Sequence, residues 1–326
     1  MSIALVPTAN ELNDVLPTER LLPNGVAIPE LRASFRHIDN WRNARAVFMV
    51  WFWTALLAYG GVHWGIAAAV AAFLLMGPMH ARFAILMHES AHRLLFAKKK
   101  VNDFIGTWVV AYPAFIPISV YRRSHFAHHR EEFGPDEPDI AFYRGYPCER
   151  RDLRRRLLRD AVGISGYKNF VALLGAAFKP TSRRIACSIL GVQVVLFALF
   201  WLLTGAWWSY LAFWWLPWMT QWRVLNRLRA IAEHGGMGKS KDRRLTTHNV
   251  RQTWIARFWF VPYNTGWHLA HHVDMGVPWH NLPAYHRELQ RAGYVTEGIT
   301  FKNYFDLWRA ATTPAVNAAE RDNINF

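Results

Sequence analysis

The chain has 326 residues, of which 52% are hydrophobic and 17 are tryptophan. This composition is not that of an ordinary water-soluble domain. The formal net charge of +15 favours an anionic partner such as nucleic acid, an acidic protein or an anionic lipid surface. Only two cysteines occur, Cys148 and Cys187. They exclude a disulfide framework and a zinc site built from thiolates, so any bound metal needs other ligands.

Residues 1–40 form a polar segment with no apolar core of signal-peptide length. We therefore expect no cleaved signal peptide, and we expect the first membrane span to target the chain. This segment is predicted to be a cytoplasmic N-terminal region that precedes the membrane domain.

Two long runs, 46–79 and 185–222, contain no Lys, Arg, Asp or Glu. One membrane crossing takes about 20 apolar residues, so each run is long enough for a helical hairpin of two spans. A single buried helix of a soluble protein would be much shorter. We expect the hairpins to turn at Gly60-Gly61 and at Thr204-Gly205. The result is four transmembrane helices with both termini on one side of the membrane.

Basic residues flank both uncharged runs, whereas the expected hairpin tips carry none. The flanking positions are Arg32, Arg36, Arg42, Arg45, Lys98–Lys100, Arg150–Arg159, Arg183, Arg184 and Arg223. By the positive-inside rule these flanks are cytoplasmic. The sequence thus predicts a multi-pass membrane protein whose termini and polar segments lie on the cytoplasmic side.

A third uncharged stretch, Phe104–Tyr121, is interrupted by Pro113 and Pro117. It fits an interfacial or re-entrant segment better than a fifth crossing, which would place the histidine clusters on its two sides in different compartments. Further on, the run Arg150–Arg159 has Leu153 and Leu157 one helical turn apart among arginines. It predicts a helix lying on anionic headgroups, with a docking patch for an acidic electron carrier as the alternative. Nucleic-acid binding is excluded, because the basic residues flank membrane spans and the aromatic residues lie within them.

Histidines form three motifs at helical spacing. They are HxxxH at His88 and His92, HxxHH at His125, His128 and His129, and HxxHH again at His268, His271 and His272. Residues three and four apart share one face of a helix, so each motif can present its imidazoles to a single point. All three motifs adjoin apolar segments on the same predicted side of the membrane, and we expect them to converge there.

Eight imidazoles indicate two metal ions, because a single catalytic zinc needs only three protein ligands. Imidazole binds iron, zinc, copper and nickel. A pair of irons can use O2 and two external electrons to attack an unactivated C–H bond, a redox capacity that zinc lacks. The sequence also matches HExxH at His88-Glu89-Ser90-Ala91-His92, so an intramembrane zinc metalloprotease is a remote alternative. It would leave both HxxHH motifs unexplained, and Glu89 can instead orient a ligand histidine.

A non-redox metal-binding or transport protein is an alternative from another class. It would need polar residues inside the spans, and these are nearly absent.

The order and spacing of the three motifs resemble the membrane fatty-acid desaturase family, in particular its acyl-lipid type. The segment 88–106 resembles the family's first-box region, and Val277–Pro283 with His286 resembles the stretch after its third box. The resemblance implies an all-α membrane domain at 41–310, with four transmembrane helices, interfacial helices and a cytoplasmic cap that carries two irons. Residues 311–326 would be a C-terminal tail.

The resemblance also implies a ninth ligand. Glu233-His234-Gly235 is similar to the element that supplies an extra histidine in related di-iron membrane enzymes, with a solvent-facing loop histidine as the alternative. Acyl-CoA members have Asn four residues earlier, where this chain has Ala230; Asn264 could take that role, although a helix cap is the simpler interpretation. Six histidines are not expected to bind metal, and His80 among them is expected to be buried and hydrogen-bonded. These are His37, His63, His80, His248, His280 and His286.

From these features we expect O2-dependent desaturation of a lipid-linked fatty acyl chain, with no catalytic residue beyond the metal ligands. A hydroxylase or ketolase of an alkyl or terpenoid substrate is the alternative. The chain has no haem motif of a fused cytochrome b5 and no flavin or nicotinamide fingerprint. Electrons are therefore expected from a separate ferredoxin or cytochrome b5-like donor.

Overall fold

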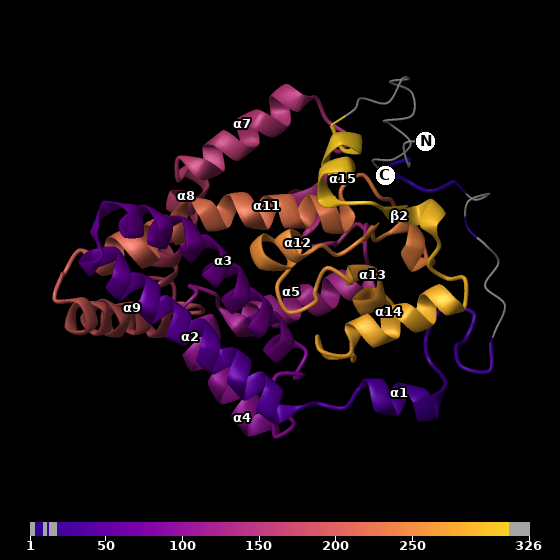
Figure 1. Cartoon of the computed structure of the whole chain (residues 1–326), viewed down its shortest axis with the longest axis horizontal. Helices are drawn as coiled ribbons and strands as arrows, with labels where there is room; N and C mark the ends of the chain where they lie inside the picture. The colour runs from indigo at the N-terminus through magenta and orange to yellow at the C-terminus, as the bar shows by residue number, and fades with distance from the viewer. Residues whose placement is uncertain (1–3, 9–11, 13–17, 313–326) are drawn as a thin grey trace. The chain divides into compact units, whose positions relative to one another are not determined.

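The computed structural model describes residues 4–8, 12 and 18–312, and Figure 1 shows that helices dominate it. Within these residues the one sheet is a two-stranded parallel pair, β1 (Asn249–Val250) and β2 (Thr300–Phe301). The predicted all-α fold is confirmed at this level. Most of the expected C-terminal tail lies outside the described residues.

The internal contacts divide the chain into two compact units. Unit 1 comprises residues 1–37, 123–155 and 227–326, and unit 2 comprises 38–122 and 156–226. Each unit thus gathers segments that are far apart in the sequence, and each is described here by itself.

Unit 2 contains the long apolar helices. The helices are α2 (Asn40–His63), α3 (Gly65–Ala91), α4 (Lys99–Phe104), the π-helix η2 (Ile105–Ala111), α8 (Ile164–Ala176), α9 (Arg183–Thr204), the π-helix η3 (Leu211–Trp215) and α10 (Leu216–Met219). Three helical stretches among the described residues are long and apolar enough to cross a membrane: Pro29–His63, which contains α2, Gly65–Ala91 and Arg183–Thr204. Membrane insertion of the chain accords with these three stretches.

The first hairpin turns later than we expected. Helix α2 continues through Gly60-Gly61, and the turn falls at Trp64-Gly65, where Gly65 has a φ of +83°. Gly61 instead allows close packing, because a Cβ there would come within 2.6 Å of the Phe213 ring. The second expected turn is confirmed, since α9 ends with Gly205 in the left-handed region, the usual conformation of a helix-ending glycine.

The expected fourth span is not one continuous helix. After Gly205 the chain forms η3, then α10 with Pro217 in its first turn, and breaks at Thr220 before α11 (Gln221–His234) begins. Proline cannot donate the helical hydrogen bond, so a helix is interrupted or kinked around it. Uncharged composition, the basis of the prediction, does not reveal such interruptions.

The segment around Pro113 and Pro117 breaks as predicted. Helix η2 ends at Ala111, a turn follows, and α5 (Ile118–Arg130) begins after Pro117. The turn is held by Gln193, whose Nε2 donates to the Tyr112 carbonyl at 2.7 Å. The basic run likewise forms the predicted helix, α7 (Arg150–Ala161), with Leu153 buried and its arginines mostly exposed.

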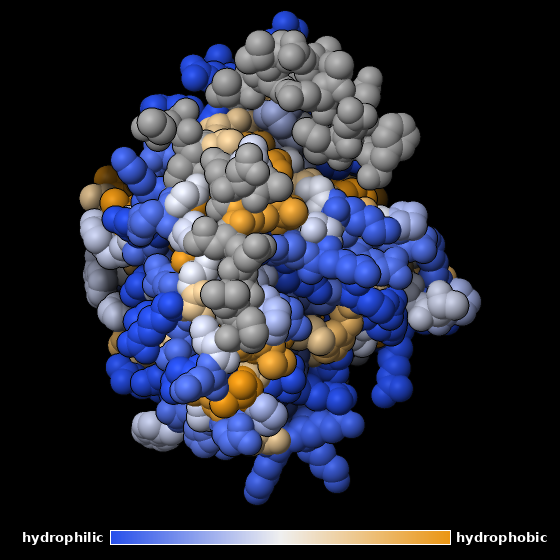
Figure 2. Space-filling view, turned by 90° about the vertical axis from the view of Figure 1, so that its right-hand side faces the viewer, coloured by the Kyte–Doolittle hydropathy of each residue, from blue (hydrophilic) through white to orange (hydrophobic). Residues whose placement is uncertain are grey.

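Unit 1 is built from shorter helices around a small apolar core. Its elements are α1 (Pro29–Phe35), α6 (Ile140–Tyr143), the 3-10 turns η4 (Arg243–Leu245) and η5 (Glu297–Ile299), α12 (Trp254–Trp259), α13 (His268–Val273), α14 (Leu282–Arg291) and α15 (Tyr304–Ala310), with the later parts of α5 and α11. Figure 2 shows a face of the molecule on which hydrophilic residues predominate.

An ion-pair cluster fixes α1 against the end of α13. The buried carboxylate of Asp274, the residue after α13, accepts from Arg32 Nε at 2.8 Å and from Arg36 Nη2 at 2.5 Å. Tyr285 of α14 donates to the Gly25 carbonyl at 2.8 Å. These contacts hold in place the helix that carries the third histidine motif.

Candidate metal centre

Seven of the nine predicted ligands lie in unit 1, and all seven are buried. Helix α5 carries His125, His128 and His129, and α13 carries His268, His271 and His272, in both cases at the spacing that places them on one helical face. His234 is the last residue of α11. Within unit 1 the structure therefore brings the second and third histidine motifs together with His234.

One group of rings, the His234 cluster, consists of His128, His234, His268 and His272. The Nε2 atoms of His234 and His268 are 3.1 Å apart, and those of His268 and His272 are 3.0 Å apart. One ring nitrogen each from His128, His234 and His272 lies within 4.8 Å of the other two.

A second group, the His271 cluster, consists of His125, His129 and His271. The Nε2 of His129 lies 3.1 Å from that of His125 and 3.1 Å from that of His271. The two groups are adjacent, because the rings of His129 and His272 have centroids 4.3 Å apart. Unit 1 thus offers two neighbouring sets of inward-facing imidazole nitrogens, which fits two metal ions.

Contacts on the outer ring nitrogens fix these orientations. The Nδ1 of His234 donates to the Thr246 carbonyl at 2.8 Å, so the proton of the neutral ring is on Nδ1 and a lone pair is left on Nε2. His128 Nδ1 lies 2.9 Å from Glu137 Oε1, and His272 Nδ1 contacts Glu132 Oε1. Metal-binding histidines are characteristically held in this way by carboxylates and carbonyls.

Glu132 lies close to one histidine of each cluster, His272 and His129. Its carboxylate is buried and pairs with Arg243, whose Nη2 also donates to the His129 carbonyl at 2.9 Å. A carboxylate oxygen of Glu132 also lies within 4.8 Å of ring nitrogens of His129 and His272, so Glu132 could itself contribute a metal ligand.

Burial favours the neutral form of three of these rings, which is the form that binds metal. It lowers the pKa of His234, His268 and His272 well below the ordinary value of 6.5. Burial acts in the same direction on His128, but the hydrogen bond and charge of Glu137 outweigh it and raise the pKa of His128. Glu137 thus favours a proton on Nδ1 of His128, which leaves Nε2 for a metal.

The imidazole nitrogens of the two clusters are ligands of a kind that binds iron. Neutral imidazoles whose lone pairs face one another at about 3 Å repel unless a proton or a cation lies between them. Several such nitrogens around one point form a site for a divalent metal of the kind that imidazole prefers, iron included.

His88 and His92 lie in unit 2, at the C-terminal end of α3. Their ring centroids are 4.7 Å apart. Glu89 is fully buried, and its Oε1 is 3.7 Å from Nδ1 of His88, longer than a hydrogen bond. The pair thus presents two imidazoles from one helical turn, with a carboxylate beside the first.

The histidines that we did not expect to bind metal have other roles. The expectation for His80 is confirmed: it is buried and its Nε2 donates to the Trp214 carbonyl at 3.0 Å. His63 donates in the same way to the Thr204 carbonyl at 3.0 Å, and His37 is exposed.

His248, which we did not expect to bind metal, is buried. Its Nε2 donates to the Gly235 carbonyl at 2.8 Å and its amide to the Glu233 carbonyl at 2.9 Å. The interpretation of Asn264 as a helix cap was wrong. Asn264 does not cap α13, whose N-cap is Trp267; it lies in a turn with a φ of +61°.

The sequence analysis missed Glu132, Glu137, Thr246 and His248. Glu132 and Glu137 follow the second motif closely, so the search for a carboxylate beside each histidine motif would have found them. No local signal points to Thr246 or His248, because they reach the site through a turn that returns to α11.

Comparison with known proteins is consistent with this arrangement. The family model described as "Fatty acid desaturase" matches residues 64–301. Dihydrorhizobitoxine desaturase of Bradyrhizobium elkanii is 26% identical over 255 residues, which cover 72% of this chain and 71% of that protein. Zeaxanthin 4-ketolase of Chlamydomonas reinhardtii is 27% identical over 106 residues, which cover 31% of this chain and 23% of the ketolase. The first similarity extends over most of both chains, whereas the second is confined to a segment.

Proposed function

This chain belongs to the fatty acid desaturase family and is an oxidoreductase, and we propose that it uses O2 and a di-iron centre to introduce a double bond into a lipid-linked fatty acyl chain. The observation that carries the proposal is the convergence of buried Nε2 atoms from three chain segments in unit 1. The proposed ligands are His88, His92, His125, His128, His129, His234, His268, His271 and His272.

When bound, the two irons supply O2 activation with two external electrons, and so the power to remove hydrogen from an unactivated C–H bond. The protein supplies ring orientation through Glu132, Glu137 and the Thr246 carbonyl. Burial of the rings excludes bulk water, which would otherwise quench a strong oxidant. We propose no further catalytic side chain.

The substrate is inferred from the apolar character of the chain. Three long apolar helices indicate a protein that meets its substrate in the membrane. The names of the two relatives specify dihydrorhizobitoxine and zeaxanthin rather than a fatty acid. The proposal of a lipid-linked acyl chain therefore rests on the family and on these apolar helices.

A second candidate function is hydroxylation or ketone formation on an alkyl or terpenoid substrate, and the similarity to a ketolase favours it specifically. Both reactions begin with removal of one hydrogen. The outcome then depends on whether the oxidant lies nearer to the neighbouring C–H bond or to the carbon radical, a matter of sub-ångström positioning.

Product analysis separates these functions. In a first assay, the chain should be expressed in a host poor in desaturated lipids, and the lipids of that host should be analysed. In a second assay, the purified chain should be supplied with a reduced ferredoxin or cytochrome b5-like donor and O2. We expect a lipid product that has lost two hydrogens and contains a new double bond. A product that has gained oxygen without a double bond would establish the hydroxylase or ketolase, and lipid extracts unchanged in both assays would refute the acyl substrate.

We also propose four spans, with the histidine motifs and both termini in the cytoplasm. This orientation rests on the basic residues that flank the long helices. Reporter fusions near Gly65 and Gly205 should report the outer side, and fusions near Lys99 and at Phe326 the cytoplasm. A fusion near Lys99 that reports the outer side would contradict the orientation.

A further inference from the structure

The C-cap of α3 is His92, so this helix ends within the first histidine motif. The Leu94 amide donates to the Glu89 carbonyl at 2.8 Å, and the Arg93 amide donates to the Ser90 carbonyl at 3.0 Å. This pair of bonds is a common helix ending, in which the residue with left-handed backbone is usually glycine. Here that residue is Arg93, with a φ of +62°. A non-glycine residue keeps this conformation only where its surroundings enforce it.

Asn102 of α4 holds the chain on both sides of this helix ending. It is fully buried, and its Nδ2 donates to the Ser90 carbonyl at 3.0 Å. Its Oδ1 accepts from the amides of Leu95 and Phe96 at 3.1 and 3.2 Å. The approach is close, because a Cβ at Gly106 of η2 would lie 1.7 Å from Ser90 Oγ. Asn102 therefore joins the last turn of α3 to the loop that follows it.

Arg122 of α5 binds two carbonyls of the same turn of α3. Its Nε donates to the Ala91 carbonyl at 2.9 Å, and its Nη2 donates to the Ser90 carbonyl at 2.9 Å. Carbonyls in the last turn of a helix lack their usual amide partners, and the helix dipole favours a cation there. Asp103 orients the guanidinium, since its Oδ1 accepts from Nη2 of Arg122 at 2.8 Å. The other carboxylate oxygen of Asp103 lies 3.7 Å from Nη2 of Arg93.

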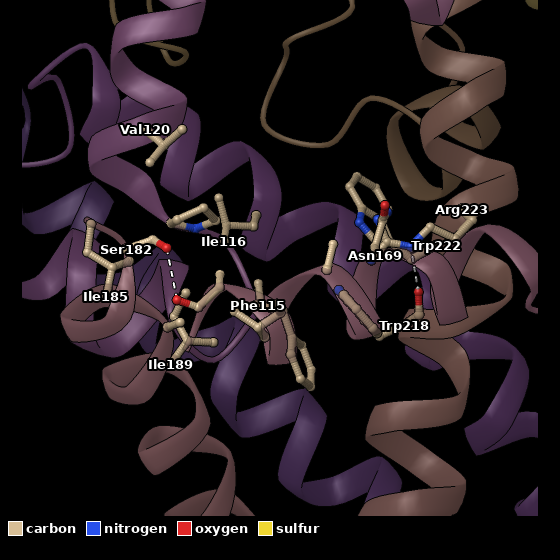
Figure 3. Close-up of a pocket in the computed structure, with 16 residues that line it drawn as sticks. Phe115, Ile116, Val120, Asn169, Ser182, Ile185, Ile189, Trp218, Trp222 and Arg223 are labelled. Atoms are coloured by element: carbon tan, nitrogen blue, oxygen red, sulfur yellow. Dashed lines mark hydrogen bonds between the residues drawn. The ribbon is translucent and has the colours of Figure 1, made fainter. Parts of the chain in front are cut away.

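The start of α5 has a second neighbour, a largely apolar pocket of about 410 Å³ (Figure 3). Ile116, Pro117 and Val120 line this pocket, and Arg122 does not. Val120 and Arg122 are two residues apart, so they lie on different faces of α5. The contacts of α5 with the end of α3 can therefore be changed separately from its contacts with the pocket.

We propose that four side chains position the first histidine motif for metal binding, and this Arg122 network consists of Ser90, Asn102, Asp103 and Arg122. All four belong to unit 2, as do His88 and His92. The network binds the backbone between these two histidines and so fixes the turn from which both rings project. It acts through the backbone and contributes no ligand. The inference rests on the proposed function, in which His88 and His92 bind metal, and ligands must be held to within about 0.5 Å for tight binding.

Titration of the anaerobic, iron-free full chain with Fe²⁺ tests this role. Arg122→Gln removes the charge and the paired donors, and it should weaken Fe²⁺ binding by about tenfold, as loss of other orienting groups does. Arg122→Lys keeps the charge but not the paired donors, so its affinity should be intermediate. Val120→Ala changes the same turn of α5 at a position that lines the pocket, and it should leave the affinity unchanged.

Asp103→Asn is a second variant, which serves also if Arg122→Gln does not fold. It removes the charge that orients Arg122 and should weaken Fe²⁺ binding less than Arg122→Gln does. Because Asp103 acts through Arg122, the double variant should bind Fe²⁺ about as weakly as Arg122→Gln alone. Losses that add in the double variant would show that the two residues do not form one network.

Gln193→Leu separates positioning from stability. It removes a buried hydrogen bond elsewhere in unit 2 and should lower the melting temperature of the iron-free chain without changing Fe²⁺ affinity. Unchanged affinity in Arg122→Gln, or an equal loss in Gln193→Leu, would overturn the proposal.

His88→Ala is the reference for the ligand itself. Full Fe²⁺ affinity in His88→Ala would refute the ligand assignment of the proposed function and this inference with it. Weaker binding in His88→Ala, with none in Arg122→Gln, would refute the positioning role alone.

Discussion

Histidines outside the proposed metal site are held differently from the ligands of unit 1. In unit 2, the buried His80 and the exposed His63 each donate to one backbone carbonyl, those of Trp214 and Thr204. In unit 1, His234 and His268 direct their Nε2 atoms at one another and at further rings. The type of residue therefore does not identify a metal site. Convergence of several lone pairs on one space does, because only a cation stabilises that arrangement.

The hydrogen-bond partners of buried polar groups also differ between the two units. A buried polar group of unit 2 is satisfied within its own helix bundle, as Gln193 is by the Tyr112 carbonyl and the Tyr210 hydroxyl. In unit 1 the outer nitrogens of His128, His234 and His272 are satisfied by Glu137, the Thr246 carbonyl and Glu132, so their inner nitrogens remain directed at the centre. Loss of a contact should therefore affect stability at residues of unit 2 that are neither proposed ligands nor contacts of the first histidine motif, such as His80 and Gln193, and metal binding in unit 1.

The largest effect is expected from His234→Ala, which removes a ring from the centre of its cluster. Iron and activity should be lost together, with activity lowered by roughly a hundredfold or more. The exposed His37, changed to alanine, is the control and should retain both. Iron at the level of the unmodified protein in His234→Ala would show that this ring is not a ligand.

A smaller effect is expected from Glu132→Gln, because glutamine keeps the shape but weakens the contact with His272 and removes the charge that pairs with Arg243. Loss of such an orienting carboxylate typically lowers metal affinity or activity by about ten- to a hundredfold. Metal titration of the anaerobic protein measures this change. Glu131→Gln alters the exposed neighbouring acid and should leave the affinity unchanged; equal losses in both variants would refute the specific role.

His248→Ala should have a moderate effect. It removes the hydrogen bond to the Gly235 carbonyl, which fixes the turn after His234, and leaves that buried carbonyl without its donor. We expect iron affinity a few-fold lower and a lower melting temperature, with His248→Gln recovering part of both. Unchanged iron affinity in His248→Ala, alongside a lower melting temperature, would restrict the residue to stability.

The smallest effect on the metal is expected from His80→Leu in unit 2. The Trp214 carbonyl would lose its donor, which should cost about 1–3 kcal/mol of stability. The melting temperature should fall while the iron content per folded chain stays the same. A loss of iron in proportion to that of His234→Ala would show that His80 is not a purely structural histidine.

Local sequence predicted the features that depend on neighbours along the chain. The spacing of His125, His128 and His129 fixes a helical face, and Pro113 and Pro117 break a helix wherever they occur. The interruption near Pro217 was missed because the fourth span was predicted from the absence of charge alone. The packing role of Gly61 depends on Phe213 in another helix, so composition did not show it. The same limitation applies to His248, whose partner Gly235 is thirteen residues away.

Metal analysis of the anaerobically purified chain tests the central claim most directly. The arrangement predicts close to two irons per chain in the unmodified protein, and loss of iron and activity in His128→Ala and His271→Ala with expression still measurable. One zinc per chain with no iron would contradict the di-iron centre. Full iron content and activity in either variant would contradict the ligand assignment.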